Sequence, residues 1–296
     1  MLKIYIKQQG FSLVEMAIVL VILGFVLSTL LLPLRAQREQ AAQLQTTNTL
    51  ESAKQALLGY AQQQGRLPCP ATAINFQGNT DTGSSGQENP LGGTRNTVIA
   101  PALPVPRCVA QSGYLPAATL GIQPTDAQGF ALDSWNNRIR YAITADESSS
   151  FGSPRTNNPA QIIDATHPAC GGDTAPDFTT SGNLAAVGLV CLVPNLRVCA
   201  SSAAANCTAT VNLINNAVAV IFSTGQTEVA EANTLPVIVR PDETQNLNAI
   251  GVNQIDTIFV SHDISLAAAP NEFDHLVTWI SPYVLYNAMI QAGQLH

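Results

Sequence analysis

The sequence predicts an α+β fold in which a long amino-terminal helix packs on an antiparallel β-sheet. Three observations support this prediction. Residues 11–32 form an almost unbroken apolar run, and residues 36–61 are rich in the helix formers Ala, Gln, Leu and Glu. From Arg66 onward, short apolar runs alternate with Gly, Pro, Ser and Asn, which is typical of strands and loops. The expected regions are a leader at 1–10, a spine helix at 11–64 with a membrane span at 11–32, and a globular head at 65–296.

The apolar run from Phe11 to Leu32 contains one charged residue, Glu15. At about 1.5 Å per residue, a helix of this length crosses a bilayer core of about 30 Å. Lys3 and Lys7 precede it, which favours a cytoplasmic amino terminus. We therefore expect a single-pass membrane protein whose head lies on the opposite side of the membrane.

The stretch Gln9-Gly10-Phe11-Ser12-Leu13-Val14-Glu15 stands directly before the apolar core. A secretory signal would instead place its small-residue cleavage site after that core. The stretch resembles the processing site of type IV prepilins and pseudopilins. The resemblance implies cleavage between Gly10 and Phe11 by a prepilin peptidase and N-methylation of Phe11. It also implies an inner-membrane location with a periplasmic head before incorporation into a pilus or pseudopilus.

Glu15 is costly in a membrane, because a carboxylate in a bilayer segment costs about 2.5–3.5 kcal/mol on insertion scales. The resemblance implies that Glu15 pairs with the amino group of Phe11 in a neighbouring subunit of a filament. The alternative is a carboxylate close enough to the interface to reach water.

Gly24 and Pro33 are predicted helix breakers in the anchor, because proline removes a helical hydrogen bond and clashes with the preceding turn. Beyond them the helix is expected to resume. Gly65 and Pro68 are expected to stop it. An apolar stripe at helical spacing predicts the face that the head covers, and its residues are Leu50, Ala53, Leu57, Leu58 and Ala61.

The head is predicted to contain several strands and one terminal helix. The segment Arg138–Thr144 alternates polar and apolar residues, so we expect one of its faces to be wet. The other expected strands are Leu184–Val193, Ala217–Ser223, Val237–Arg240 and Thr257–Ser261. A last helix is expected over Glu272–Gln291, interrupted near Pro282, with Phe273, Leu276, Trp279 and Ile280 on one face.

Several phrases of the head resemble a group of large bacterial pilin-like proteins. They include Gly65-Arg66-Leu67-Pro68-Cys69-Pro70, Gly113-Tyr114-Leu115-Pro116, Asp133-Ser134-Trp135-Asn136-Asn137-Arg138 and Phe273-Asp274-His275-Leu276. The group's usual wording has glycine where this chain has Asn136. Asparagine tolerates the left-handed turn that such a glycine suggests. The resemblance supports the architecture and implies no biochemical activity.

The six cysteines at 69, 108, 170, 191, 199 and 207 all follow the apolar segment. An even number beyond an export segment favours disulfides in an oxidising compartment, the alternative being reduced, buried thiols. Six cysteines permit many pairings. Of these possible sets of pairings, we predict Cys69–Cys108, Cys170–Cys191 and Cys199–Cys207.

Charged residues make up 11% of the chain, the net charge is −7, and the 13 lysines and arginines form no cluster. This composition argues against a nucleic-acid binder. No glycine-rich phosphate loop occurs.

Two acid–histidine pairs, His262-Asp263 and Asp274-His275, could supply ligands to a metal ion. The first is expected at a strand end and the second at a helix start, with no third ligand at suitable spacing, so surface or capping roles are favoured. His167 near Cys170 suggests a nucleophile pair, but disulfide formation by Cys170 is favoured over it.

The loop Asn79–Glu88 offers Asp81 and Glu88 to a calcium ion but lacks the alternating acidic pattern of a calcium loop. The sequence therefore predicts neither a metal, nor another cofactor, nor an enzymatic activity.

The function predicted is structural: a subunit of a type IV pilus-like filament, minor or at the tip, assembled through its amino-terminal helix. The alternatives are a pseudopilin of a type II secretion system and a pilin-anchored adhesin or ligand-binding head. The expected partners are the prepilin peptidase, other pilin or pseudopilin subunits, and the inner-membrane assembly machinery.

Overall fold

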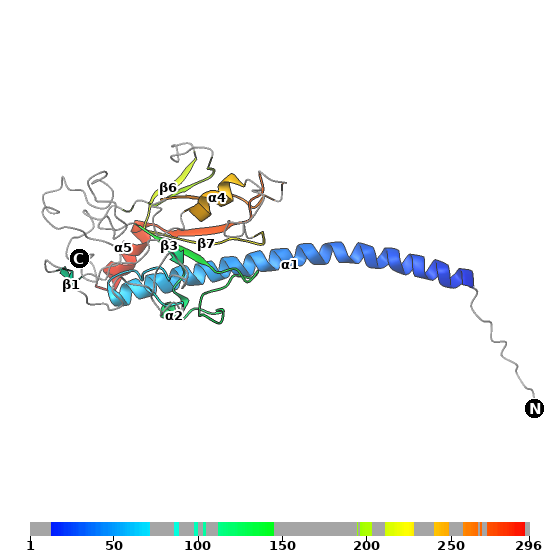
Figure 1. Ribbon diagram of the computed structural model, residues 1–296, viewed down its shortest axis with the longest axis horizontal. Coiled ribbons are helices and arrows are strands. Elements are labelled where there is room, and N and C mark those ends of the chain that lie inside the picture. Colours follow the sequence, from blue (N-terminus) through cyan, green and yellow to red (C-terminus); the bar gives the residue numbers. More distant parts are fainter. Residues whose placement is uncertain are drawn as a thin grey trace, which may run out of the picture. The chain divides into compact units, whose positions relative to one another are not determined.

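The computed structural model describes residues 13–71, 86–88, 98–99, 103–104, 112–144, 194, 196–202, 211–227, 240–248, 257–265, 267 and 271–293 (Figure 1). The chain divides into two compact units, residues 1–44 and 45–296. The helix α1 (Leu13–Gln64) contributes to both.

The first unit consists, in its described part, of the amino-terminal portion of α1. The helix runs without a break through positions 24 and 33. The expected loosening of the anchor at Gly24 and Pro33 stays a prediction. None of the helices in the described part of the chain qualifies as a candidate membrane span. The assignment of residues 11–32 to the membrane stays a prediction.

The carboxyl end of α1 lies where the sequence predicted it. The helix ends at Gln64, and Gly65 follows with a φ of 68°. The Gly65 N–H donates to the carbonyl of Ala61 at 2.9 Å. A left-handed residue directly after the last turn is the usual way to satisfy the final carbonyls of a helix, and glycine adopts it without strain.

The second unit contains two sheets. The larger has the strand order β3-β4-β7-β9, all antiparallel, and the smaller has the order β6-β5-β8, with β5 antiparallel to β6 and parallel to β8. The strands are β3 (Ser112–Tyr114), β4 (Arg140–Ile143), β5 (Leu196–Cys199), β6 (Asn212–Ala217), β7 (Ala219–Ser223), β8 (Ile258–Val260) and β9 (Leu276–Ile280). The remaining elements are the pair β1 (Val98–Ile99) and β2 (Leu103–Pro104) and the helices α2 (Ala117–Leu120), α4 (Pro241–Asn248) and α5 (Pro282–Gln291).

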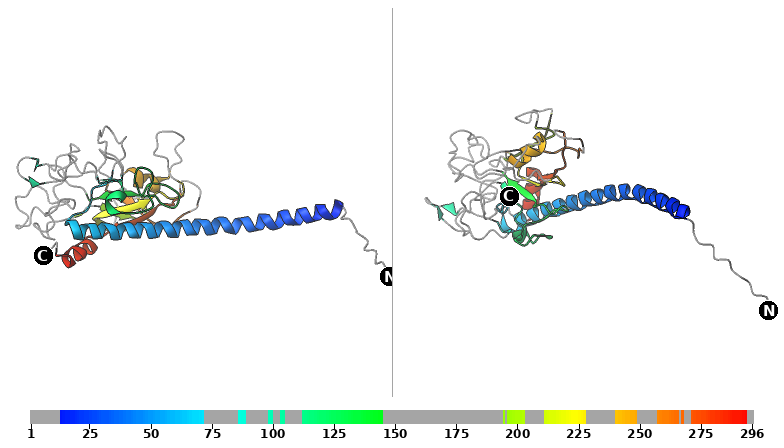
Figure 2. Two further views of the ribbon diagram at one scale, coloured as in Figure 1. Left: turned by 90° about the horizontal axis from the view of Figure 1, so that it is seen from below. Right: turned by 45° about the vertical axis from the view of Figure 1, so that its right-hand side comes forward.

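One face of the larger sheet packs on the part of α1 that belongs to the second unit (Figures 1 and 2). The predicted stripe is confirmed, since Leu50, Ala53, Leu57, Leu58 and Ala61 are all buried. They share one core with residues of β4, β7 and α5, namely Tyr141, Ile143, Ala219, Ile221, Leu285 and Met289. The α+β fold with a long helix on antiparallel strands is therefore confirmed.

The other face of the larger sheet packs on the smaller sheet. Alternate residues of β7, Val220 and Phe222, join Leu196, Val198 and Phe259 in a second core. Both faces of β7 are covered, which accounts for its apolar residues at every position from Ala219 to Phe222.

The predicted wet face of the first strand is wrong, because all four residues of β4 are buried. Arg140 itself is buried, with its guanidinium carbon 4.4 Å from the Tyr114 ring centre. Contact with an aromatic ring stabilises the guanidinium of a buried arginine, so a polar residue in an alternating pattern need not face solvent.

The prediction of one last helix over Glu272–Gln291 is wrong in its first half. Residues 276–280 form strand β9 rather than the first half of a helix, and the helix α5 begins at Pro282. Ser281 caps α5 by accepting a hydrogen bond from the Val284 N–H at 3.4 Å. Proline suits the first turn of a helix, where its missing N–H would have no partner in any case.

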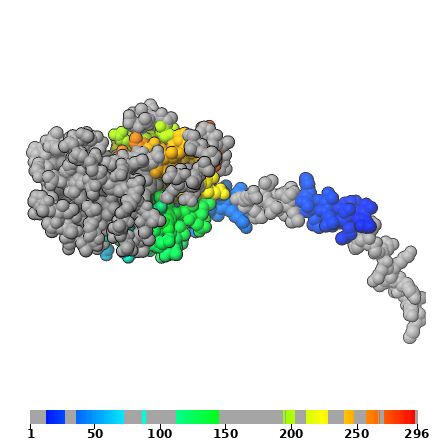
Figure 3. Space-filling view, in the orientation of Figure 1, coloured from blue at the N-terminus to red at the C-terminus, as the bar shows by residue number. Residues whose placement is uncertain are grey.

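The other strand predictions have mixed outcomes. Those over Ala217–Ser223 and Thr257–Ser261 are confirmed as β7 and β8. Leu184–Val193 and residues 237–239 lie outside the described residues, and Arg240 directly precedes α4. Residues 112–144 appear in green in the space-filling view of Figure 3 and form one patch on the visible face of the second unit.

Candidate functional site

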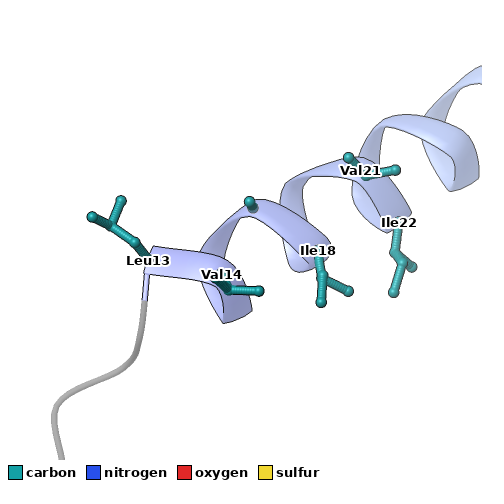
Figure 4. Close-up of a pocket in the computed structure, with 6 residues that line it drawn as sticks. Leu13, Val14, Ile18, Val21 and Ile22 are labelled. Carbon is teal, nitrogen blue, oxygen red and sulfur yellow. The ribbon is translucent and has the colours of Figure 1, made fainter.

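The amino-terminal part of α1 presents apolar side chains in every direction. Leu13 is 91% exposed, Phe25 is 73% exposed, and each large apolar side chain between them is roughly half exposed or more. Successive residues of a helix point about 100° apart, so an unbroken exposed run surrounds the axis rather than forming a stripe. Six of these residues line a shallow apolar surface, drawn in Figure 4: Leu13, Val14, Ala17, Ile18, Val21 and Ile22.

Glu15 lies in the first turn of α1 and is exposed. A carboxylate in this position interacts favourably with the amino-terminal end of the helix dipole. Gly10 and Phe11, the predicted processing residues, lie outside the described residues.

The phrase around Trp135 forms a structural loop before β4. The Asp133 carboxylate accepts hydrogen bonds from the Trp135 and Asn137 N–H groups at 2.9 and 2.8 Å, and from the Ser223 hydroxyl at 2.6 Å. Burial raises the pKa of Asp133, against these hydrogen bonds. Asn136 has a φ of 69°, so the predicted left-handed turn is confirmed. These hydrogen bonds hold the loop that precedes β4 and connect it to Ser223 of β7.

A buried group of polar side chains lies on the side of the molecule where α4 meets the start of β9. Glu243, Asp274 and His275 bring one potential ligand atom each to within 4.8 Å of one another. The sequence prediction that Asp274-His275 has no third partner is therefore wrong, and so is its placement at a helix start. The sequence does not link Glu243 to this pair, because Glu243 comes from α4, some thirty residues earlier, and its only local signal is an acidic first turn.

Glu243 and Asp274 are held by different donors. The Asp274 N–H donates to Glu243 Oε1 at 3.0 Å, and both the N–H and the hydroxyl of Thr227 donate to Asp274 Oδ2, at 2.7 and 2.8 Å. Gly225 is required here, because its φ is 70° and a Cβ would lie 2.3 Å from Asp274 Oδ1. Burial raises the pKa of Glu243 to about 7.

His275 is buried between aromatic rings and held by Asn246. The Asn246 Nδ2 lies 3.1 Å from His275 Nδ1, and the ring centres of Phe273 and Phe222 lie 5.6 and 6.1 Å away. Burial lowers the pKa of His275 to about 3, so its imidazole is neutral at physiological pH.

The other acid–histidine pair does not take part in this cluster. His262 follows β8, as predicted, and its ring centre lies 3.9 Å from that of Phe273. Its Nε2 lies 3.2 Å from an oxygen of Asp242 on α4, and its Nδ1 lies 2.8 Å from the Asp263 carbonyl. The predicted surface role is the one the geometry supports.

Glu88, one of the residues considered for calcium, has both carboxylate oxygens occupied by protein donors. Arg66 donates to both oxygens at 2.8 Å, Tyr60 donates to Oε1 at 2.9 Å and the Cys69 N–H to Oε2 at 3.3 Å. Asp81, His167 and Cys170 lie outside the described residues.

Cys69 and Cys199 are buried, and each is disulfide-bonded. The other four cysteines fall outside the part of the chain that the structure describes, so the three predicted pairings remain predictions.

Comparison with known proteins gives one match. Residues 6–31 match the prokaryotic N-terminal methylation motif, and this range includes Gly10, Phe11 and Glu15. No curated protein and no solved structure matches the chain. The motif implies a type IV pilin-like or pseudopilin-like protein, processed by a prepilin peptidase, anchored in the inner membrane and assembled with pilin-like subunits. It does not resolve the subgroup.

Proposed function

We propose that the mature chain is a structural subunit of a type IV pilus-like filament, present in low copy number or at the tip. The observation that carries this proposal is the methylation motif at residues 6–31, continuous with a helix whose apolar side chains are exposed on all sides. Such a surface suits lipid before assembly and the apolar helices of other subunits afterwards.

The proposed route has three steps. The peptidase cuts between Gly10 and Phe11, and Phe11 is N-methylated. Residues 11–32 then hold the protein in the inner membrane, with its amino terminus cytoplasmic and residues 65–296 periplasmic. The assembly machinery finally draws the helix out of the lipid into the filament core.

Glu15 has a defined place in this route. Its cost in lipid, about 2.5–3.5 kcal/mol, is offset when it meets the amino group of Phe11 of a neighbouring subunit. The anchor is thus more favourably placed in the filament than in the bilayer, and the charge pair sets the register between subunits.

The test compares Glu15→Gln with the matched control Glu39→Gln, which changes a glutamate on the same helix outside the apolar run. Glu15→Gln should be processed and inserted normally but should fall by on the order of tenfold or more in sheared filaments, since tenfold corresponds to about 1.4 kcal/mol. Glu39→Gln should assemble like the wild type. Equal incorporation of Glu15→Gln would contradict the pairing.

The same shearing experiment distinguishes the two filament types. A pilus subunit should appear in filaments sheared from the cell surface, at low copy relative to the major subunit. Protein that stays in the cell envelope would instead indicate a pseudopilin of a type II secretion system.

A further inference from the structure

The group Glu243, Asp274 and His275 contains buried polar atoms that the hydrogen bonds above do not satisfy. Glu243 Oε2, Asp274 Oδ1 and His275 Nε2 have no hydrogen-bond partner among the described residues. Glu243 and His275 are 0% and 2% exposed. A buried polar atom without a partner is unfavourable, so three such atoms in one place indicate a ligand or a proton.

A metal ion is the first candidate, because two carboxylates and an imidazole are common metal ligands. Asn246 argues against it. The Asn246 Oδ1 accepts from the Val260 N–H at 2.6 Å while its Nδ2 donates to the Val260 carbonyl at 3.0 Å, which fixes the orientation of the amide. The second N–H of the amide then points at His275 Nδ1, which must accept it. The neutral imidazole therefore carries its proton on Nε2 and has no free lone pair for a metal.

No charged group among the described residues donates a hydrogen bond to Glu243 Oε2 or Asp274 Oδ1. Arg240 donates through Nε and Nη2 to Glu272, at 2.7 and 2.6 Å, and its Nε forms an ion pair with Glu243 Oε2 at 3.6 Å, too long for a hydrogen bond. Arg140 of β4 is close enough to act on His275, and Asp133 adds a further negative charge near Asp274. Glu243 and Asp274 lie close enough for a hydrogen bond between their side chains. Two carboxylates that share a site in this way favour a shared proton.

We propose that Glu243 and Asp274 hold one proton between them, so that this cluster is a proton-binding site rather than a metal site. The proton comes from solvent and bonds Glu243 Oε2 to Asp274 Oδ1. It ties α4 to the start of β9, and through Thr227 to the loop after β7. Loss of the proton leaves two buried like charges and weakens the attachment of α4.

The direction of the pH effect follows from the environment of Glu243. Burial raises its pKa from 4.5 to about 7, and the neighbouring carboxyl acts the same way. A raised carboxyl pKa gives stability that is complete below the unfolded value and is lost as the pH rises through the folded value. The window is therefore 4.5 to about 7.

Glu243→Gln is an isosteric test of the shared proton. The Asp274 N–H requires an oxygen at the Oε1 position, so the amide nitrogen of the glutamine takes the Oε2 position and donates to Asp274 permanently. This variant should fold as well as the wild type at pH 5. Glu51→Gln, an exposed change on α1, controls for loss of a carboxylate as such.

The readout is reversible unfolding of the full chain in detergent, from pH 4 to pH 8. The ratio of the unfolding constants, wild type over Glu243→Gln, removes the contributions of groups that do not interact with residue 243. It should rise by at most about tenfold per pH unit between 4.5 and about 7 and level off outside that window. A ratio that stays flat over the whole range would overturn the proposal.

Two further measurements do not depend on unfolding. The infrared carbonyl stretch of a protonated carboxyl group should be present at pH 6 in the wild type and absent in Glu243→Gln. After dialysis against zinc or manganese and then buffer, the wild type should retain no stoichiometric metal. One equivalent retained by the wild type and lost in Glu243→Gln would show a metal site and contradict the shared proton.

Discussion

Asn136 stands at a φ of 69°, in a region that costs most residues about 1–2 kcal/mol and that glycine enters freely. At the scale of single residues, positions with such a backbone conformation determine how the loops of the head are closed. The Asn136 N–H donates to the Asp133 carbonyl at 3.2 Å and closes the loop whose Asp133 carboxylate orients β4.

The consequence can be measured by denaturant unfolding of two variants. Asn136→Ala should lower the free energy of unfolding by about 1 kcal/mol, because alanine lacks the local hydrogen bonding that lets asparagine enter this region. Asn136→Gly should stay within about 0.5 kcal/mol of the wild type. Equal losses in both variants would indicate that the side chain, and not the backbone conformation, matters.

Arg66 and Glu88 form a buried charge pair, 3% and 7% exposed, with Tyr60 and Cys69 as further partners. Removing one partner of such a pair leaves the other charge without compensation. Glu88→Ala should therefore cost about 3–5 kcal/mol in thermal or chemical unfolding. Glu51→Ala removes an exposed partner of Lys54 and should cost less than about 1 kcal/mol; similar losses for the two variants would contradict the buried pair's role.

Asp126 predicts an acid-dependent loss of stability. Burial acts to raise its pKa, but hydrogen bonds from the Phe130 N–H and the Arg138 guanidinium outweigh burial and lower it below 3.8. A lowered carboxyl pKa gives stability that is present above the unfolded value and lost as the pH falls through the folded one. Asp126→Asn should thus destabilise the protein at pH 7 and flatten its stability profile below about pH 4. An unchanged acid limb in this variant would rule the pair out as its source.

At the scale of elements, α1 combines two environments in one helix. Its residues 13–26 expose apolar side chains, while its carboxyl-terminal stripe is buried against β4, β7 and α5. The stripe packs in the core of the head, and hydrogen bonds from the Ser134 N–H to Thr46 and from Gln62 to the Ala288 carbonyl add to this contact.

Alanine variants of Leu57 and Leu44 compare the two environments in one experiment. Leu57 is fully buried, so Leu57→Ala should lower the free energy of unfolding by about 2–5 kcal/mol. Leu44 is 67% exposed, and Leu44→Ala should change it by no more than about 0.5 kcal/mol. Comparable losses at both positions, measured by chemical denaturation, would contradict the assignment of the stripe.

The elements also show what sequence patterns can specify. The stripe on α1 was predictable because its spacing fits a helix and no strand. The segment around Leu276 and Trp279 was misread because its three-residue spacing fits a helix while its Val, Thr and Ile favour a strand; pairing with β7 decides the matter. Pro282 marks the start of α5 rather than a break within one helix.

At the scale of the whole molecule, sequence predicted the class of fold and the processing motif, because both depend on local patterns. It did not predict the buried cluster. Glu243, Thr227 and Asp274 come from three separate elements, and only the packing of the two sheets and α4 brings them together. Likewise, the burial of Arg140 depends on a second sheet covering β4, which alternation alone cannot reveal.

The central claim is that this chain is a processed, filament-forming subunit, and its processing can be measured directly. Intact-mass analysis of the protein purified from membranes should show loss of residues 1–10 and addition of one methyl group, placing the new amino terminus at Phe11. A retained Met1, or a cut after Leu32, would contradict the claim.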